Sequence, residues 1–176
     1  MRKPVYLFMM FPYIAAVLLL SIVLISCYSI IDLNTDVDRA RQSEMPIVIY
    51  YITPYYPNSA GGVDVSIGFI NATDNIIKYT RFMVRAYNAV GEMELCEIRH
   101  RETSLLRCVG PLGPGKRDYG DWSNVWYNYA IRYIVLEYVK VTFMNGDEVI
   151  IKGEDLSLIL ASKFKSNKFY ASYKGR

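Results

Sequence analysis

The sequence contains a single histidine, His100, and only three cysteines among its 176 residues. One histidine excludes a multi-histidine metal site, and a Ser-His-Asp site would have to use a residue that we place in or beside a hairpin turn. We therefore interpret His100 as a solvated turn residue. The sequence predicts no catalytic residue, no metal ligand and no cofactor, so we expect a protein that is not an enzyme.

Acidic residues are absent from both ends of the chain, since the first is Asp32 and the last is Asp155. Residues 28–160 hold 13 basic and 17 acidic residues, which is not the basic surplus typical of nucleic-acid-binding domains. We therefore expect no nucleic-acid partner. The last sixteen residues carry only basic charges, on Lys163, Lys165, Lys168, Lys174 and Arg176. This basic tail is either a segment that binds an anionic surface of lipid or glycan, or a disordered solubilising end.

The N-terminus has the pattern of a membrane-targeting segment. Two basic residues precede an apolar run over residues 5–25. The run leads into Leu24-Ile25-Ser26-Cys27, which resembles the bacterial lipobox. The resemblance implies that residues 1–27 are a lipoprotein signal peptide and that Cys27 is lipidated. The alternative is an uncleaved helix over residues 8–31, which is long enough to span a bilayer. Both interpretations anchor the chain in a membrane and place the remainder outside the cytoplasm, on the periplasmic side or the cell surface.

Cys96 and Cys108 remain as a pair in a compartment that permits disulfides. We predict an antiparallel hairpin of residues 93–100 and 104–109, in which Cys96 faces Cys108. This register predicts a disulfide that closes a short loop and restricts the unfolded chain. The alternative is two buried free thiols.

Short alternating segments predict a fold made mainly of β-strands. Residues 63–69 and 138–143 alternate between apolar and polar or small side chains, and Asn145-Gly146 after the second segment is a strong hairpin signal. Since no long helical pattern separates the segments, we predict a single antiparallel β-sandwich of about seven or eight strands. The predicted divisions are the leader of residues 1–27, a polar tether over 28–45, the sandwich over 46–153, and a short helix or extension with the basic tail over 154–176.

The predicted sandwich contains the segments Pro57-Asn58-Ser59-Ala60-Gly61-Gly62-Val63-Asp64-Val65, Ile76-Ile77-Lys78-Tyr79 and Ala86-Tyr87-Asn88-Ala89-Val90-Gly91. Together with the lipobox-like leader, they resemble small immunoglobulin-like or fibronectin-III-like modules of bacterial envelope proteins. The resemblance covers about residues 46–152. It implies a spacer or a binding unit, and it supplies a fold more than a function.

Aromatic residues cluster at Trp122, Trp126, Tyr127 and Tyr129. They either cover the end of the sandwich core or form a face that binds a protein partner or a glycan. From these patterns we predict a membrane-anchored extracytoplasmic structural or interaction module of the bacterial cell envelope, which binds a protein partner or assembly. The alternative is a glycan- or peptidoglycan-binding domain that uses Trp122 and Trp126.

Overall fold

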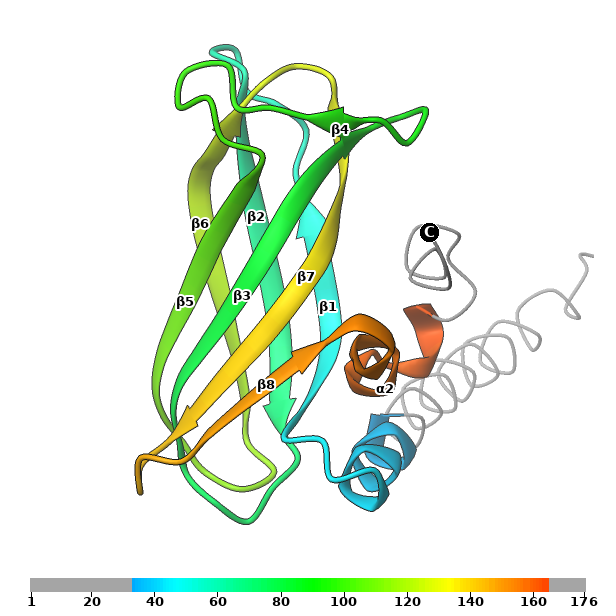
Figure 1. The fold of residues 1–176 in the computed structure, drawn as a ribbon, viewed down its shortest axis with the longest axis vertical. Helices are drawn as coiled ribbons and strands as arrows, with labels where there is room; N and C mark the ends of the chain where they lie inside the picture. Colours follow the sequence, from blue (N-terminus) through cyan, green and yellow to red (C-terminus); the bar gives the residue numbers. More distant parts are fainter. Residues whose placement is uncertain (1–32, 165–176) are drawn as a thin grey trace, which may run out of the picture. The chain divides into compact units, whose positions relative to one another are not determined.

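The computed structural model describes residues 33–164, and this part of the chain is mainly β (Figure 1). A helix occupies residues 33–42. The strands are β1 (Ile47–Pro54), β2 (Gly62–Asn71), β3 (Ile77–Asn88), β4 (Met93–Glu94), β5 (Thr103–Leu112), β6 (Arg117–Tyr127), β7 (Ile131–Phe143) and β8 (Glu148–Lys152). Three short helical segments follow them: η1 (Gly153–Asp155), α2 (Leu156–Ile159) and η2 (Ser162–Phe164).

The strands form two antiparallel sheets that face each other as a β-sandwich (Figure 1). One sheet has the strand order β1-β2-β6. The other has the order β4-β3-β7-β8. Strand β5 also pairs with β3, along residues 77–85, and β4 pairs with the two residues of β3 that follow. The prediction of a mainly β, antiparallel sandwich is confirmed.

The core lies between the sheets because the strands alternate between buried and more exposed side chains. In β2 the apolar members of the predicted alternation, from Val63 to Phe69, are all buried. Phe69 meets Phe82 of the opposite sheet edge to face, with ring centroids 5.3 Å apart. The same alternation that fills the core leaves one outward-pointing series of side chains on each sheet.

The hairpin predicted at Asn145-Gly146 is present between β7 and β8. Gly146 has a φ of +94°, which favours glycine, and the Phe143 N–H donates to the carbonyl of Asp147 at 2.9 Å. Thr142 then pairs with Glu148 at the start of the ladder. This turn sets the register of β8 on β7.

The predicted hairpin of residues 93–100 and 104–109 is wrong. Its first arm is strand only over Met93–Glu94, and both β4 and β5 pair with β3 instead of with each other. The chain turns back after Cys96, whose N–H donates to the carbonyl of Arg101 at 3.0 Å. Cys108 lies opposite Thr80 of β3. The hairpin does not form because β3 is long enough to pair with both β4 and β5 along one edge. Strand β5 therefore lies beside β3 and not beside β4.

Both ends of the described chain join the folded unit. The helix over residues 33–42 contributes the buried residues Asp36 and Ala40, and α2 contributes Leu156 and Ile159. Just after α2, Leu160 forms a parallel bridge with Ile49 of β1. The compact unit that begins at Asp36 therefore includes residues that lie outside the predicted sandwich boundaries of 46 and 153.

The predicted leader of residues 1–27 lies outside the described residues, and so does most of the basic tail. Within residues 33–164, no helix combines the length and apolar character that a membrane span requires.

Candidate functional site

The predicted aromatic cluster separates into buried and exposed members. Trp126 lies opposite Val63 in the pairing of β6 with β2, and it is fully buried. Trp122 and Tyr127 are partly buried against the core, and the Trp122 ring meets Phe82 edge to face at 6.4 Å. The Trp126 ring is therefore not available for stacking on a glycan or for contact with a partner.

Tyr129 is the exposed member of this cluster, and it organises the neighbouring loop. Its hydroxyl donates to the carbonyl of Ser59 at 2.6 Å. Its ring lies over Gly61, where an added Cβ would come 3.1 Å from the tyrosine Cε2, so a larger residue would displace the ring. Its carbonyl accepts a hydrogen bond of 2.7 Å from Arg132. Tyr129 thus joins the loop after β1 to the start of β7.

The predicted disulfide between Cys96 and Cys108 is absent, because both are buried free thiols. The Cys96 sulfur accepts a hydrogen bond of 3.4 Å from the Tyr127 N–H, whereas the Cys108 sulfur lies 2.8 Å from the position of a Cβ added to Gly120. Gly120 and Tyr127 are seven residues apart in the same strand, so the two backbone positions are about 23 Å apart at about 3.3 Å per residue, and the two sulfurs lie far from each other. A disulfide needs an S–S distance near 2 Å.

The two thiols have different electrostatic surroundings. Burial raises the pKa of the Cys108 thiol to about 12, and the Asp118 carboxylate acts in the same direction. Burial also acts to raise the pKa of Cys96, but backbone N–H groups of Arg99, Tyr127 and Ile98 stabilise the thiolate and lower the pKa overall. Cys96 is therefore the more acidic of the two thiols.

The remaining predicted site residues lie at the ends of the chain. Lys163 is exposed in η2. The predicted lipidation site, Cys27, is outside the described residues, and the same holds for the other four basic tail residues: Lys165, Lys168, Lys174 and Arg176.

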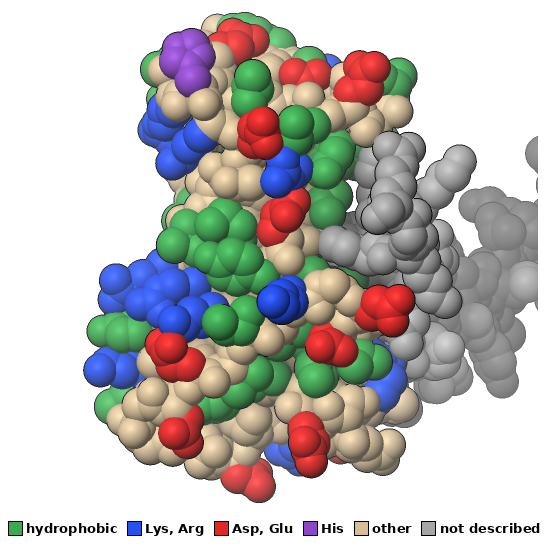
Figure 2. Space-filling model, viewed as in Figure 1, with side chains coloured by type: hydrophobic (Ala, Val, Ile, Leu, Met, Phe, Trp, Pro, Cys, Tyr) green, Lys and Arg blue, Asp and Glu red, His purple; other side chains and the backbone are tan. Residues whose placement is uncertain are grey.

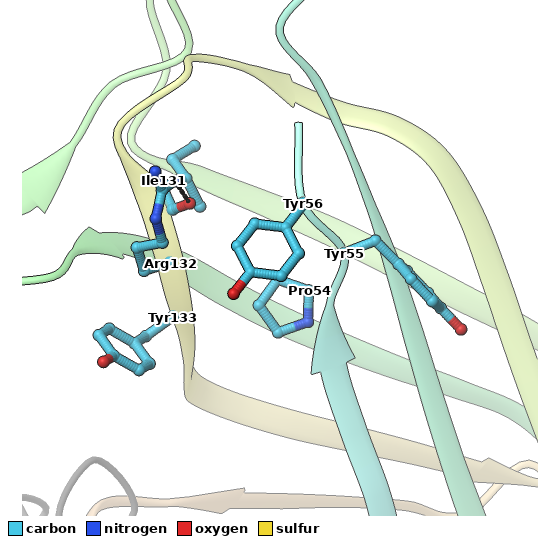
Figure 3. Close-up of a pocket in the computed structure, with 6 residues that line it drawn as sticks. All are labelled: Pro54, Tyr55, Tyr56, Ile131, Arg132 and Tyr133. Atoms are coloured by element: carbon cyan, nitrogen blue, oxygen red, sulfur yellow. Dashed lines mark hydrogen bonds between the residues drawn. The ribbon is translucent and has the colours of Figure 1, made fainter. Parts of the chain in front are cut away.

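A hollow of about 200 Å³ lies at one end of the sandwich (Figure 3). Its wall combines the end of β1 and the following loop with the start of β7, through Pro54, Tyr55, Tyr56, Ile131, Arg132 and Tyr133. The Arg132 guanidinium lies 5.8 Å from the centre of the Tyr56 ring, within the range of a cation–π contact. The hollow is thus lined by aromatic rings and one cation.

Tyr56 is held in this exposed position by an ordered loop. Its side chain is 85% exposed, and the residue lies between Pro54 and Pro57, which restrict the backbone. Asn58 closes the loop, since its side-chain oxygen accepts hydrogen bonds of 2.9 Å from the N–H groups of Ala60 and Gly62. The loop therefore presents a large aromatic side chain from a backbone with restricted conformational freedom.

The outer surface of β5, β3 and β7 forms a second candidate site, which we call the basic face and define by Lys78, Tyr79, Arg81, Leu105, Arg107, Val109 and Lys140. Arg81 lies directly opposite Arg107 on one side and Lys140 on the other, so three cations form a row across three strands. Figure 2 shows Lys and Arg side chains gathered on this face beside exposed apolar ones.

The cations of the basic face surround one aromatic ring. The guanidinium carbons of Arg107 and Arg81 lie 4.1 and 5.2 Å from the centre of the Tyr79 ring, and the Lys78 ammonium lies 5.4 Å from it. Lys140 forms an ion pair of 2.7 Å with Glu148. Within residues 33–164, Lys78, Arg81 and Arg107 form no ion pair with a carboxylate.

Sequence reasoning missed both surfaces. The basic residues Arg81, Arg107 and Lys140 come from three separate strands, and only the register of β5 and β7 on β3 brings them together. The sequence shows the position of each basic residue within its own strand, but it does not show which strands pair. The prolines around Tyr56 indicate a turn, but Arg132 is distant in sequence, so the sequence does not show that the two residues are neighbours.

Among the described residues, no group of three or more His, Cys, Asp or Glu side chains is arranged to hold a metal ion.

No protein-family model and no curated protein matches this chain. A search of solved structures found a similarity to a hypothetical protein from Peptoclostridium difficile 630, whose X-ray structure was determined at 1.85 Å. The two chains superpose with a TM-score of 0.44 and 11% sequence identity, over 71% of this chain and 98% of that chain. A similarity at this level does not identify a function.

Proposed function

We propose that this protein is a membrane-anchored extracytoplasmic interaction module of the bacterial cell envelope, and that it binds a protein partner through Tyr56 and Arg132. The basic n-region, the apolar run and the lipobox-like Cys27 support the anchor and the compartment. The two facing antiparallel sheets, one of three strands and one of five, support a fibronectin-III-like assignment, since such modules share the β-sandwich architecture.

The observation that carries the proposal is the exposed, preorganised Tyr56 beside Arg132. Tyrosine and arginine are enriched among the residues that dominate protein–protein binding energy, and truncation of such a residue typically weakens binding by 2 kcal/mol or more. Because Pro54, Pro57 and Asn58 already restrict the loop, binding loses little additional backbone entropy. The hollow beside Tyr56 accepts a side chain of the partner.

Site-specific photocrosslinking in living cells tests this proposal. A photoreactive phenylalanine analogue replaces Tyr56 in the full chain, and a second chain carries it at Tyr119, which is 67% exposed on the sheet β1-β2-β6. We expect one discrete protein adduct from position 56 and none of that size from position 119. Adding Arg132→Ala should reduce the adduct strongly, since it removes the neighbouring cation. Adducts of equal size and yield from both positions would contradict the proposal.

A glycan-binding function is the second candidate, and it is favoured by the outer surface of β1-β2-β6. Tyr51 and Tyr119 lie on either side of Gly68 in the strand register, and the Tyr50 ring covers Gly68, where an added Cβ would come 2.8 Å from the ring. Tyr55 lies nearby: the Ser66 hydroxyl donates its one proton to the Asp121 carboxylate, and its oxygen lies 3.3 Å from the Tyr55 hydroxyl, from which it can accept. Aromatic rings beside polar groups of this kind are suited to stacking on a sugar face.

Calorimetric titration with soluble peptidoglycan fragments distinguishes the two functions. A glycan-binding domain should release or absorb heat with the wild-type protein and lose that signal in Tyr119→Ala. Tyr56→Ala serves as the control, since it removes an exposed tyrosine from the other candidate surface. Absence of any saturable heat would remove the glycan alternative and leave the protein-binding proposal untouched.

A further inference from the structure

We propose that the basic face lies against the anionic phospholipid surface of the membrane in which the chain is anchored. This inference rests on the anchor of the proposed function, but it concerns a surface other than the Tyr56 hollow. The occupant is a bilayer that contains phosphatidylglycerol or a similar acidic lipid.

The charge arrangement of the basic face is unfavourable in the isolated domain. Arg81 and Arg107 are direct cross-strand neighbours, and like charges in that position destabilise a sheet. The same β3 shows how such a cation is otherwise neutralised: Arg85 forms ion pairs of 2.6 Å with both Glu102 and Glu137. Glu148, which pairs with Lys140, also attracts Arg81 electrostatically, whereas Arg107 forms no ion pair within residues 33–164. An external anion would relieve the repulsion that remains.

Apolar side chains flank the cations on the same surface. Leu105 and Val109 precede and follow Arg107 at alternate positions of β5, and they are 49% and 63% exposed. Tyr79 lies opposite Val109 on β3. Basic residues that bind headgroup phosphates, combined with aliphatic and aromatic side chains at the acyl boundary, are the features of a surface that adsorbs to anionic membranes.

The chain outside the described residues reinforces this choice of partner. Asp36 accepts hydrogen bonds of 2.8 and 2.5 Å from the N–H and hydroxyl of Ser162, so the first and last described segments of the folded unit are in direct contact. The leader contains an apolar run of about membrane length, and residues 165–176 contain four basic and no acidic residues. A leader that anchors the chain raises the local concentration of the domain and of the tail at the membrane, which makes weak contacts effective.

A fluorescent label on the basic face tests the inference in the full chain. Val109→Cys is coupled to an environment-sensitive dye, and the chain without the added cysteine gives the background labelling. The protein is reconstituted in vesicles of phosphatidylcholine alone or of equal parts phosphatidylcholine and phosphatidylglycerol. We expect a blue shift of the dye emission in the mixed vesicles, and we expect it to disappear at about 1 M salt, where screening acts over about 3 Å.

Reversing the charges of the basic face, and separately those of two arginines elsewhere, gives a matched pair of variants. Since each basic residue near an anionic surface contributes about fivefold in affinity, Arg81→Glu with Arg107→Glu should lower the ratio of adsorbed to free domain by at least about 25-fold and abolish the shift. Arg99→Glu with Arg101→Glu makes the same change in net charge beside His100 and should leave the shift in place. Circular dichroism confirms that each variant is folded.

Three results would overturn the inference. They are an equal shift in neutral vesicles, a shift that survives the reversal of Arg81 and Arg107, and an equal shift when soluble polyglutamate replaces phosphatidylglycerol. Flotation with neutral vesicles tests the anchor separately. A chain that floats without a shift in mixed vesicles contradicts the basic-face inference alone, whereas a chain that does not float contradicts the anchor and the inference together.

Discussion

Asp36→Ala should destabilise the domain far more than a substitution in a surface helix usually does. The Asp36 carboxylate is 2% exposed and accepts hydrogen bonds from the Arg39 guanidinium at 2.6 Å and from both the N–H and hydroxyl of Ser162. Arg39 also donates to the carbonyl of Leu160 at 2.9 Å, so the pair joins the first helix to the segment after α2.

The expected magnitude follows from the loss of one partner of a buried pair. Removal of one charge from such a pair costs about 3–5 kcal/mol, because the other charge stays buried without compensation. The Arg39 side chain is 26% exposed, so water partly hydrates its charge when Asp36 is removed. We therefore expect a loss of stability at the lower end of this range, about 3 kcal/mol. With a urea m-value of about 1.5 kcal/mol per M, the midpoint of unfolding should fall by roughly 2 M.

Urea unfolding of residues 33–164, followed by tryptophan fluorescence, measures this effect. Asp38→Ala makes the same chemical change at an exposed position of the same helix, and its effect should stay within about 0.5 kcal/mol. A cycle with Arg39→Ala should give a coupling energy above about 1 kcal/mol. Equal midpoints for Asp36→Ala and Asp38→Ala would refute the reasoning, since the helix would then contribute nothing through Asp36.

Three further predictions concern other parts of the chain. In native protein both Cys96 and Cys108 should be alkylated only after unfolding, and mass mapping without reductant should find no link between them. The Lys140 ammonium lowers the pKa of Glu148 in the folded state, so this pair stabilises the fold above about pH 4.5 and loses its effect as pH falls through the folded pKa; Glu148→Gln should flatten the acid limb of the stability profile. Cys27→Ser should abolish labelling by a fatty-acid analogue, and unchanged labelling would remove the lipoprotein interpretation.

Local sequence patterns were sufficient for the fold class, because alternation and turn chemistry act over a few neighbouring residues. The series from Val63 to Phe69 has the period of a half-buried strand, and Asn145-Gly146 adopts the backbone that a tight hairpin needs. These signals predicted strands and one correct hairpin without any knowledge of the strand order.

Strand pairing was decided by the tertiary structure. The prediction placed Cys96 opposite Cys108 because the two segments are adjacent in sequence and their patterns are complementary. In the folded chain β3 pairs with β4, β5 and β7, and this arrangement holds the two sulfurs apart against different positions of β6. Pairing between strands depends on which long strand occupies the centre of a sheet, and that choice involves contacts distant in sequence.

The two candidate surfaces also depend on strand pairing that the tertiary structure decides. Composition and charge alone indicated a nearly neutral domain with a basic tail, and they gave no reason to single out Arg81, Arg107 or Lys140. The basic face exists because the register of three strands aligns these cations on one surface, and the hollow at Tyr56 exists because the start of β7 meets the loop after β1. The sequence by itself determined the alternation, the turns and the membrane-targeting pattern, whereas the sites depend on side chains that only long-range packing brings together.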